Sequence, residues 1–499
     1  MAQRSLLSLF GGPEGAAFAR GRALMILGCA SHVGKSWTAT AICRYLKRRG
    51  VRVAPFKAQN MSNNSQACAD GGEIGRAQAA QAEACGVEPR SDMNPVLLKP
   101  SAGSVQVIVN GQVWKENVAP REYYEHHAYL SEQVDAAYRR LATQFDFIVA
   151  EGAGGAAELN LADRDLANLP LARRFGIPAL LVANIDRGGV FASVYGTLRL
   201  IDEGDRALIR SFLVNRFRGD MELFADGRQT LEKLAEKPCL GVFPYADDIR
   251  LDAEDSLSAP NGKGLARRPD ELRIAIIRLP HLSNFTDFNL LPNADYIEAA
   301  TDYEPDLIIL PGTKNTLEDL AWLREAGIDK WILDRRKSGT AVWGVCGGFQ
   351  MMGRAVEDPE AVESRRRRLP GLGLFPAMTT LEPKKVVREV NAVLELNGTS
   401  FKGYEIHLGR MTPTGSAETP FCRIDGQPEG WRKRGLLGTT IHGAFENRTV
   451  LRALLVEVAE WRHKVAPGLP EDNKELHYNR LADWFEQHVD RQRFEELYL

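Results

Sequence analysis

Short apolar runs alternate along the chain with longer mixed segments, beginning at residue 23. Such runs have the length of one buried strand, and parallel strands joined by crossover helices produce this alternation. The first group comprises 23–27, 51–56, 145–150, 178–183, 212–214 and 240–243. The second comprises 272–279, 306–312 and 341–346. The pattern therefore predicts two α/β units, the first with a parallel sheet.

A change of composition separates the two units. Residues 258–270 are rich in glycine, proline and charge and have no apolar period, as is typical of linkers. Residues near 355–370 are charged and are expected to form an exposed loop. The predicted organisation is an extension (1–22), a first domain (23–250), a linker (251–271), a second domain (272–465) and a C-terminal segment (466–499) of one or two amphipathic helices.

Amino-acid composition and charge limit which binding partners and which cellular compartment are expected for this protein. The 499 residues are too many for one core, which agrees with two domains. The 63 basic and 65 acidic residues give a net charge of -2 without a basic block, which argues against nucleic acid or a membrane as partner. No apolar stretch approaches the roughly 20 residues of a membrane span. The seven cysteines lack C-x-x-C spacing, which favours a protein of the reducing cytoplasm. The sequence does not define the oligomeric state.

The stretch "LMILGCASHVGKSWTATAICRYL" reads as a strand, a glycine-bounded loop and a helix. Gly34, Lys35 and Ser36 have the residue types of a phosphate-binding loop, in which backbone N–H groups cradle phosphates, the lysine reaches the β and γ oxygens and the serine meets Mg²⁺. Five residues, instead of the usual four, separate Gly28 from Gly34, so a chance match is the alternative. Glu151, which ends the apolar strand in "FIVAEGAGG", is a candidate metal ligand.

Several longer strings carry a resemblance to a known family. They include "PFKAQNMSNNS" (55–65), "EGAGGAAELNLADRDLAN" (151–168), "ANIDRGGVFASVYGT" (183–197), "LPHLSNFTDFN" (279–289), "GVCGGFQMMG" (344–353) and "IHGAFEN" (441–447). From about residue 23 to about 460 the chain resembles the glutamine-hydrolysing adenosylcobyric acid synthase family of cobalamin biosynthesis. The resemblance implies that ATP and ammonia from glutamine amidate the b, d, e and g carboxylates of adenosylcobyrinic acid a,c-diamide, with Mg²⁺ as cofactor.

The first domain is also similar to dethiobiotin synthetase, another P-loop enzyme that activates carboxylates. By that similarity Glu73 falls where an acid binds the metal and Asn215 where an asparagine reads adenine. The alternatives are a solvated loop acid for Glu73 and a turn residue at a strand end for Asn215.

A lone cysteine such as Cys346 is most often a packed core thiol. Its string, however, resembles the nucleophile turn of the triad (class I) glutamine amidotransferases, which implies that the second domain has that α/β fold. The resemblance implies His442 as the base, in preference to His407, and an oxyanion hole from the backbone at Gly312 and Gly347. The usual triad glutamate would stand at 444, which is Ala; Glu446 is a candidate to orient His442, and a Cys-His dyad is the alternative.

The sequence identifies the residues that contact the corrinoid less clearly than those of the other sites. Asp163 and Asp165 are expected to align ATP, metal or ammonia, with helix capping as the alternative. Lys57, Gln59 and Asn60 are candidates to meet corrinoid carboxylates. Two other functions remain open: the sister enzyme that amidates cobyrinic acid at a and c, and a P-loop partitioning ATPase without catalysis in its second domain.

Overall fold

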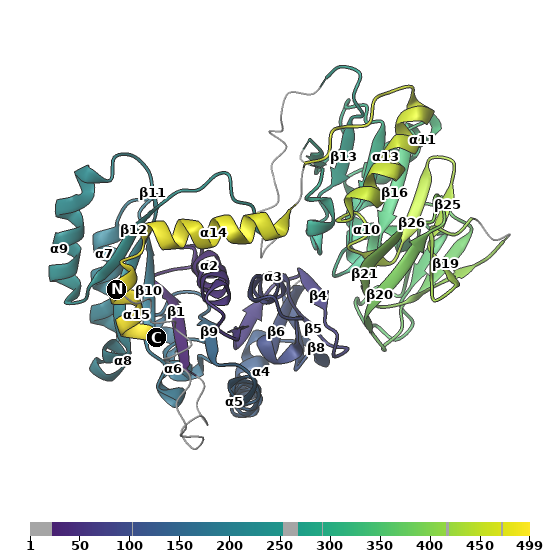
Figure 1. Ribbon diagram of the computed structural model, residues 1–499. Helices are drawn as coiled ribbons and strands as arrows, with labels where there is room; N and C mark the ends of the chain where they lie inside the picture. The colour runs from purple at the N-terminus through teal and green to yellow at the C-terminus, as the bar shows by residue number, and fades with distance from the viewer. Residues whose placement is uncertain (1–21, 102, 253–267, 292, 416–418, 471–472) are drawn as a thin grey trace.

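The computed structural model of the protein describes residues 22–101, 103–252, 268–291, 293–415, 419–470 and 473–499. Of the expected extension 1–22 it describes only Arg22, and most of the expected linker, 253–267, also lies outside the described residues. Two α/β domains lie side by side, and helix α14 returns from the second to the first (Figure 1).

The first domain is built on a six-stranded parallel sheet. Its strands, in spatial order, are β12 (Cys239–Pro244), β11 (Ile209–Phe217), β10 (Ala179–Asn184), β1 (Arg22–Gly28), β9 (Phe147–Glu151) and β2 (Val53–Phe56). Helices around it are α2 (Lys35–Arg48), α3 (Arg76–Cys85), α4 (Pro120–Glu125), α5 (His127–Gln144), α6 (Leu169–Phe175), α7 (Val190–Leu200), α8 (Glu203–Leu208) and α9 (Ala225–Ala235). All six strands predicted in this half of the chain are confirmed.

Between β2 and α4, where the apolar pattern predicts no strand, the chain forms several short strands in addition to α3. The main sheet of this segment has the order β3 (Gln59–Met61), β6 (Val96–Ser101), β7 (Ser104–Val109) and β8 (Gln112–Val118), and a small hairpin joins β4 (Ser65–Ala67) to β5 (Glu73–Gly75). Polar residues such as Lys99 and Gln106 are buried in these strands. Their polarity hides the apolar alternation by which a strand is usually recognised.

The C-terminal segment completes the core of the first domain. It forms two helices, α14 (Lys474–His488) and α15 (Arg491–Tyr498). Leu481, Phe485 and Phe494 pack with Leu24 and Ile26 of β1 in one buried cluster. The alternate residues of β1, Met25 and Leu27, face the cluster on the other side of the sheet, as the two-residue period of a strand requires.

The second domain has its own core around a six-stranded sheet. The order is β14 (Asp295–Ile297), β13 (Ile274–Ile277), β15 (Leu307–Leu310), β16 (Ala341–Val345), β26 (Leu436–Thr439) and β25 (Trp431–Lys433), with only β25 antiparallel to its neighbour. The helices are α10 (Thr316–Glu325), α11 (Ile328–Lys337), α12 (Gly347–Met351) and α13 (Arg448–Arg462).

Two smaller sheets extend this domain. One has the order β24 (Gln427–Glu429), β23 (Cys422–Ile424), β20 (Val386–Leu394), β21 (Ser400–His407) and β27 (Ile441–His442). The other has β18 (Arg368–Pro370), β17 (Ala355–Glu357), β19 (Ala377–Thr380) and β22 (Arg410–Pro413). The charged stretch near 355–370 therefore begins and ends in strands, although its middle is a loop as expected.

Candidate active sites

The phosphate-binding loop lies between β1 and α2, where the sequence predicts it. Gly34 has a φ of 103°, a left-handed conformation, and the helix begins at Lys35. The Lys35 ammonium donates hydrogen bonds to the backbone oxygens of Gly154 (2.6 Å) and Ala30 (3.1 Å). The Lys35 side chain thus lies across the loop, next to the N-terminus of α2. The ammonium group and the N-terminus of the helix both favour binding of a phosphate.

Glu151 and Ser36 meet at the start of α2. The Ser36 hydroxyl donates to Oε1 of Glu151 at 2.8 Å, and Lys57 donates to the same oxygen at 3.0 Å. Gln81 donates to Oε2 at 2.6 Å. The described residues contain no group of three or more His, Cys, Asp and Glu that could hold a metal ion. A hydroxyl and a carboxylate nevertheless fit Mg²⁺, a hard cation that in nucleotide sites takes most of its other ligands from phosphates and water.

A cavity of about 680 Å³ opens above this cluster. Of the residues proposed from the sequence, it is lined by Gly34, Lys35, Ser36, Glu151, Lys57, Gln59, Asn60 and Asp165. Gln59 and Asn60 are tied to Tyr123 (2.7 Å) and Gln78 (2.8 Å), which fixes their amides at the cavity wall.

Two of the proposed acids do not line the cavity as free carboxylates. Asp163 is exposed and is absent from its lining. Asp165 accepts hydrogen bonds from the backbone N–H groups of Ala167 (2.7 Å) and Asn168 (3.1 Å), just before α6. These two bonds close a local turn before the helix begins. The N-cap of α6 is Asn168, so Asp165 does not have the helix-capping role that the sequence left as its alternative.

Glu73 has a different role from the metal ligand that the resemblance implies. Its side chain is fully buried and pairs with Lys99 (2.9 Å) and with Lys385 of the second domain. Burial alone would raise the pKa of Glu73, but Lys385 and Lys99 outweigh it and lower the pKa to about 2. The carboxylate is neutralised between two ammonium groups, and the structure does not bring it to Ser36 and Glu151.

Asn215 lies against the phosphate loop at the end of β11. Its amide donates to the backbone oxygen of Val33 at 2.9 Å, so close to Gly34 that a Cβ there would lie 2.1 Å from Nδ2. Asn215, Trp37, Tyr245 and Trp484 line a small pocket beside the loop. Its aromatic walls suit a flat base next to the phosphates.

Cys346 stands at a tight turn between β16 and α12. It has φ 51° and ψ -115°, a conformation that non-glycine residues rarely adopt. A Cβ on Gly348 would lie 2.1 Å from the backbone oxygen of Leu310, so only glycine allows the helix to pack this closely. A strained cysteine on a strand-to-helix turn matches the geometry of a nucleophile elbow rather than of a core thiol.

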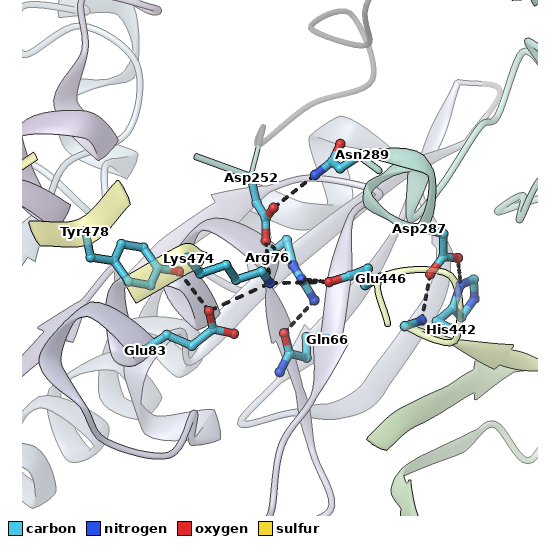
Figure 2. A network of polar contacts seen from close by, with 11 residues as sticks. Gln66, Arg76, Glu83, Asp252, Asp287, Asn289, His442, Glu446, Lys474 and Tyr478 are labelled. Carbon is cyan, nitrogen blue, oxygen red and sulfur yellow. Dashed lines mark hydrogen bonds and ion pairs between the residues drawn. The ribbon is translucent and has the colours of Figure 1, made fainter. Parts of the chain in front are cut away.

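His442 is the histidine paired with this cysteine. Its Nδ1 lies 2.7 Å from Oδ2 of Asp287, while the other oxygen of Asp287 accepts from Gly443 N–H at 2.6 Å (Figure 2). His442 and Asp287 are each 1 % exposed. Burial lowers the pKa of His442, but Asp287 and Cys346 outweigh it and raise the pKa to about 10. A histidine beside the sulfur, itself held by a carboxylate, is the arrangement typical of nucleophilic cysteines.

Asp287 is the third member that sequence reasoning missed. It belongs to the turn Phe285–Phe288 (η5), 155 residues before His442, whereas the usual pattern directs the search to residues just after the histidine. Glu446 does not contact His442 and binds Arg76 and Lys474 instead. The string "NFTDFN" contains Asp287, but nothing in its spacing connects it with the histidine.

The pocket at Cys346 is formed by both domains. Its walls include Thr313, Gln350, Glu363 and His407 of the second domain, together with Asn63 and Lys99 of the first. His407 binds the Gly409 backbone oxygen at 3.1 Å and lies at the wall. Gly312 lies against the imidazole of His442, since a Cβ there would be 2.9 Å from its Cε1, and a Cβ on Gly347 would contact Thr313. The two glycines proposed for the oxyanion hole thus flank the Cys346–His442 pair.

Known families match both halves of the chain. Residues 24–258 match the CobQ/CobB/MinD/ParA nucleotide binding domain, and residues 273–450 match the CobB/CobQ-like glutamine amidotransferase domain. The cobyric acid synthase of Syntrophobacter fumaroxidans is 44 % identical over 96 % of this chain and 99 % of its own length. The chain belongs to the cobyric acid synthase family. The probable cobyric acid synthase of Methanoregula boonei is 46 % identical over 94 % of this chain and 98 % of its own length.

As a member of this family, the chain is a glutamine-dependent amidotransferase with an N-terminal P-loop domain. The match to a solved glutamine amidotransferase covers 38 % of this chain and 98 % of that protein, with 20 % identity and a TM-score of 0.31. Within the part of the chain that the structure describes, no helix is both long and apolar enough to span a bilayer.

Proposed function

We propose that the chain converts adenosylcobyrinic acid a,c-diamide to adenosylcobyric acid by amidating its b, d, e and g carboxylates, with ATP and glutamine as co-substrates. One observation carries the proposal: Cys346 and Lys99, which belong to different domains, line one pocket. Ammonia is thereby released at the boundary with the domain that has the phosphate loop. Family membership supports the corrinoid as the substrate class.

The first domain activates the carboxylate. A carboxylate does not react with ammonia at neutral pH, because hydroxide or oxide would have to leave, so ATP phosphorylates it to an acyl phosphate. Lys35 and the N–H groups of the loop bind the phosphates and offset the charge on the transferred phosphoryl group. Ser36 and Glu151 would hold Mg²⁺, which supplies further charge neutralisation. Lys57, Gln59 and Asn60 line the same cavity and are our candidates to bind corrinoid carboxylates.

The second domain releases ammonia from glutamine. His442 holds the proton of Cys346, and the thiolate attacks the side-chain carbonyl of glutamine. The backbone at Gly312 and Gly347 stabilises the oxyanion, and His442 gives its proton to the departing ammonia. Water then hydrolyses the thioester, releasing glutamate and regenerating the thiol. Asp287 keeps Nδ1 of His442 occupied, so that Nε2 faces the reaction.

Glu363 is our candidate for the α-ammonium group of glutamine. It lines the pocket and accepts a hydrogen bond from the Thr316 N–H at 2.8 Å. Burial raises its pKa to about 7. Lys314 lines the same pocket and supplies positive charge for the α-carboxylate, whereas Lys99 and Lys385, which also line it, are paired with Glu73. The two charged ends of the amino acid thus have complementary partners.

We also propose that the reaction takes place in the cytoplasm. All seven cysteines have free thiols, and Cys346 must remain reduced to act as the nucleophile.

The test is an assay with the a,c-diamide, ATP, Mg²⁺ and glutamine, read by mass spectrometry. Four successive amidations are expected. Activity on cobyrinic acid alone would reassign the chain to the sister reaction, and ATP hydrolysis without amidation of either corrinoid would support the partitioning ATPase.

A further inference from the structure

We propose that Arg76 of the P-loop domain is a positioning residue for the glutaminase site, and that it sets the geometry of His442 and Asp287 from across the domain boundary. The proposal rests on the proposed function only in that both activities belong to one chain. Arg76 is the first residue of α3, and only 3 % of it is exposed. It touches neither Cys346 nor the glutamine pocket.

Arg76 joins three acceptors (Figure 2). Its Nε donates to Asp252 at 2.8 Å, Nη1 donates to Gln66 at 2.7 Å, and Nη2 donates to Glu446 at 2.5 Å. Glu446 belongs to the second domain, whereas Asp252 lies just after the sheet of the first. A planar guanidinium can bond three diverging acceptors at once, and a lysine ammonium does not reproduce this fork.

The first connection to the active site runs through Glu446. This residue follows His442 by four positions, in the short segment between β27 and α13. Lys474, at the start of α14, also contacts Glu446 at 3.3 Å and Asp252 at 3.4 Å. The backbone just after the catalytic histidine is therefore anchored to cations on two elements outside the amidotransferase fold.

The second connection runs through the turn that carries Asp287. Asn289, two residues after Asp287, donates to Asp252 at 3.0 Å (Figure 2). On the other side of Asp287, the Asn284 side chain accepts from the backbone N–H of Ser65 at 2.9 Å. Contacts with the P-loop side thus fix both ends of the turn, and Arg76 holds one of them through Asp252.

The charges of this network are fixed at neutral pH. Burial alone would raise the pKa values of Asp252 and Glu446, but Arg76 and Lys474 outweigh it and lower both. Removing Arg76 leaves two carboxylates sharing one lysine in a buried setting. Such carboxylates draw apart or admit water, which shifts the segments attached to them.

Helix α3 also connects the network around Arg76 with the phosphate-loop site. Arg76 stands at its start, and Gln81, five residues later, donates to Glu151 at 2.6 Å. One short helix therefore contacts both the acid beside the phosphate loop and the network around the glutaminase histidine.

The test compares Arg76→Met with the wild-type full-length chain. We expect the kcat of glutamine hydrolysis to fall by about 10- to 100-fold, because displacement of catalytic groups by about 1 Å has effects of that size. The KM for glutamine stays unchanged, since Arg76 is remote from the pocket. Amidation with added ammonia stays largely intact. A purely structural role would instead lower both activities in proportion to the folded fraction.

Arg44→Met is the matched control. Arg44 has a similarly buried side chain, 7 % exposed against 4 % for Arg76, and it binds Glu475 and Asn479 of α14. The groups that its guanidinium bonds, on Ala84, Glu475 and Asn479, all lie outside the amidotransferase fold, so glutaminase kcat should match the wild type. Glu446→Gln keeps an acceptor for Arg76 but removes the charge, and should give a smaller loss of the same kind even where Arg76→Met folds poorly.

Three results would overturn the proposal: wild-type glutaminase kcat in Arg76→Met, an equal loss in the Arg44→Met control, or a parallel loss of ammonia-dependent amidation. Glutamate release is measured without any corrinoid, so the role of Arg76 can be tested even where the corrinoid assignment fails.

Discussion

Replacing Asp287 by asparagine isolates the charge that acts on His442. Asparagine has nearly the same shape, and its amide oxygen can still accept from Gly443 N–H, which in the wild type is 2.6 Å from Asp287. The variant therefore preserves the turn while removing the negative charge beside Nδ1. The ring of Tyr404, stacked on the imidazole with 5.4 Å between centroids, continues to hold the histidine in plane.

The size of the effect follows from the electrostatics of the pair. A pKa of about 10, compared with the ordinary 6.5, corresponds to about 5 kcal/mol in favour of the imidazolium, at about 1.4 kcal/mol for each pKa unit. Asp287 and Cys346 share this stabilisation. We assign about 2 to 4 kcal/mol to Asp287, which predicts a loss of roughly 30- to 1,000-fold in glutaminase kcat.

The assay is glutamate release at saturating glutamine, with ammonia-dependent amidation measured in parallel. Amidation from ammonia should be unchanged, because Asp287 acts only on glutamine hydrolysis. Asp306→Asn is the matched control: Asp306 is equally buried in the same domain, but it binds Arg273 and Arg462. Glutaminase activity near the wild-type level in Asp287→Asn, or an equal loss in the control, would refute the reasoning.

The same pair affects stability in a pH-dependent way. His442 has a raised pKa in the folded state, so its contribution is fully present below about pH 6.5 and is lost as the pH rises towards about 10. Unfolding by urea should show this loss in the wild type and a smaller one in Asp287→Asn. Identical pH dependence in the two proteins would contradict it.

Three further predictions concern the other groups. Cys346→Ala should abolish glutamine-dependent amidation and leave ammonia-dependent amidation largely intact, since only the ammonia supply is lost; equal loss with both donors would contradict the division of labour. Lys35→Ala should remove amidation with either donor while glutamate release at least partly survives, and full amidation would disprove the phosphate-loop assignment. Because burial raises the pKa of Glu363 to about 7, the KM for glutamine should rise as the pH falls below about 7. Glu363→Gln should raise that KM and remove its pH dependence, and an unchanged profile would exclude Glu363 from glutamine binding.

The sequence predicted best where apolar pattern and local motif coincide. The six strands of the first sheet are continuous apolar runs, and the phosphate loop and the Cys346 turn are each determined by neighbouring residues. Strands β3 to β8 were missed because buried polar residues such as Lys99 and Gln106 interrupt the pattern. These residues are buried in partnership with others, such as Glu73, that a linear pattern does not connect.

The contacts between distant segments lay beyond sequence reasoning. Asp287 meets His442 only because the turn after β13 approaches the end of β27, which no periodicity encodes. Glu73 was assigned by similarity across families, yet its environment includes Lys385, more than 300 residues later. A metal-binding role can be predicted for a carboxylate only when the neighbouring cationic side chains are known, because these decide whether the carboxylate is available to a metal.

The return of the chain through α14 and α15 makes the amidotransferase domain an insertion. The helices that bury Leu24 and Ile26 come from the far end of the sequence, and the backbone oxygen of Leu499 accepts a hydrogen bond from Arg22. The amidotransferase domain is thus connected to the P-loop domain at both of its ends. This restricts its movement relative to the P-loop domain and keeps the glutaminase site and the phosphate-loop site at high effective concentration. Cutting the chain at residue 272 would leave the first fragment without the side chains that α14 and α15 contribute to one of its hydrophobic cores, among them Leu481, Phe485 and Phe494. A split or circularly permuted version of the enzyme should therefore carry residues 474–499 with the P-loop domain.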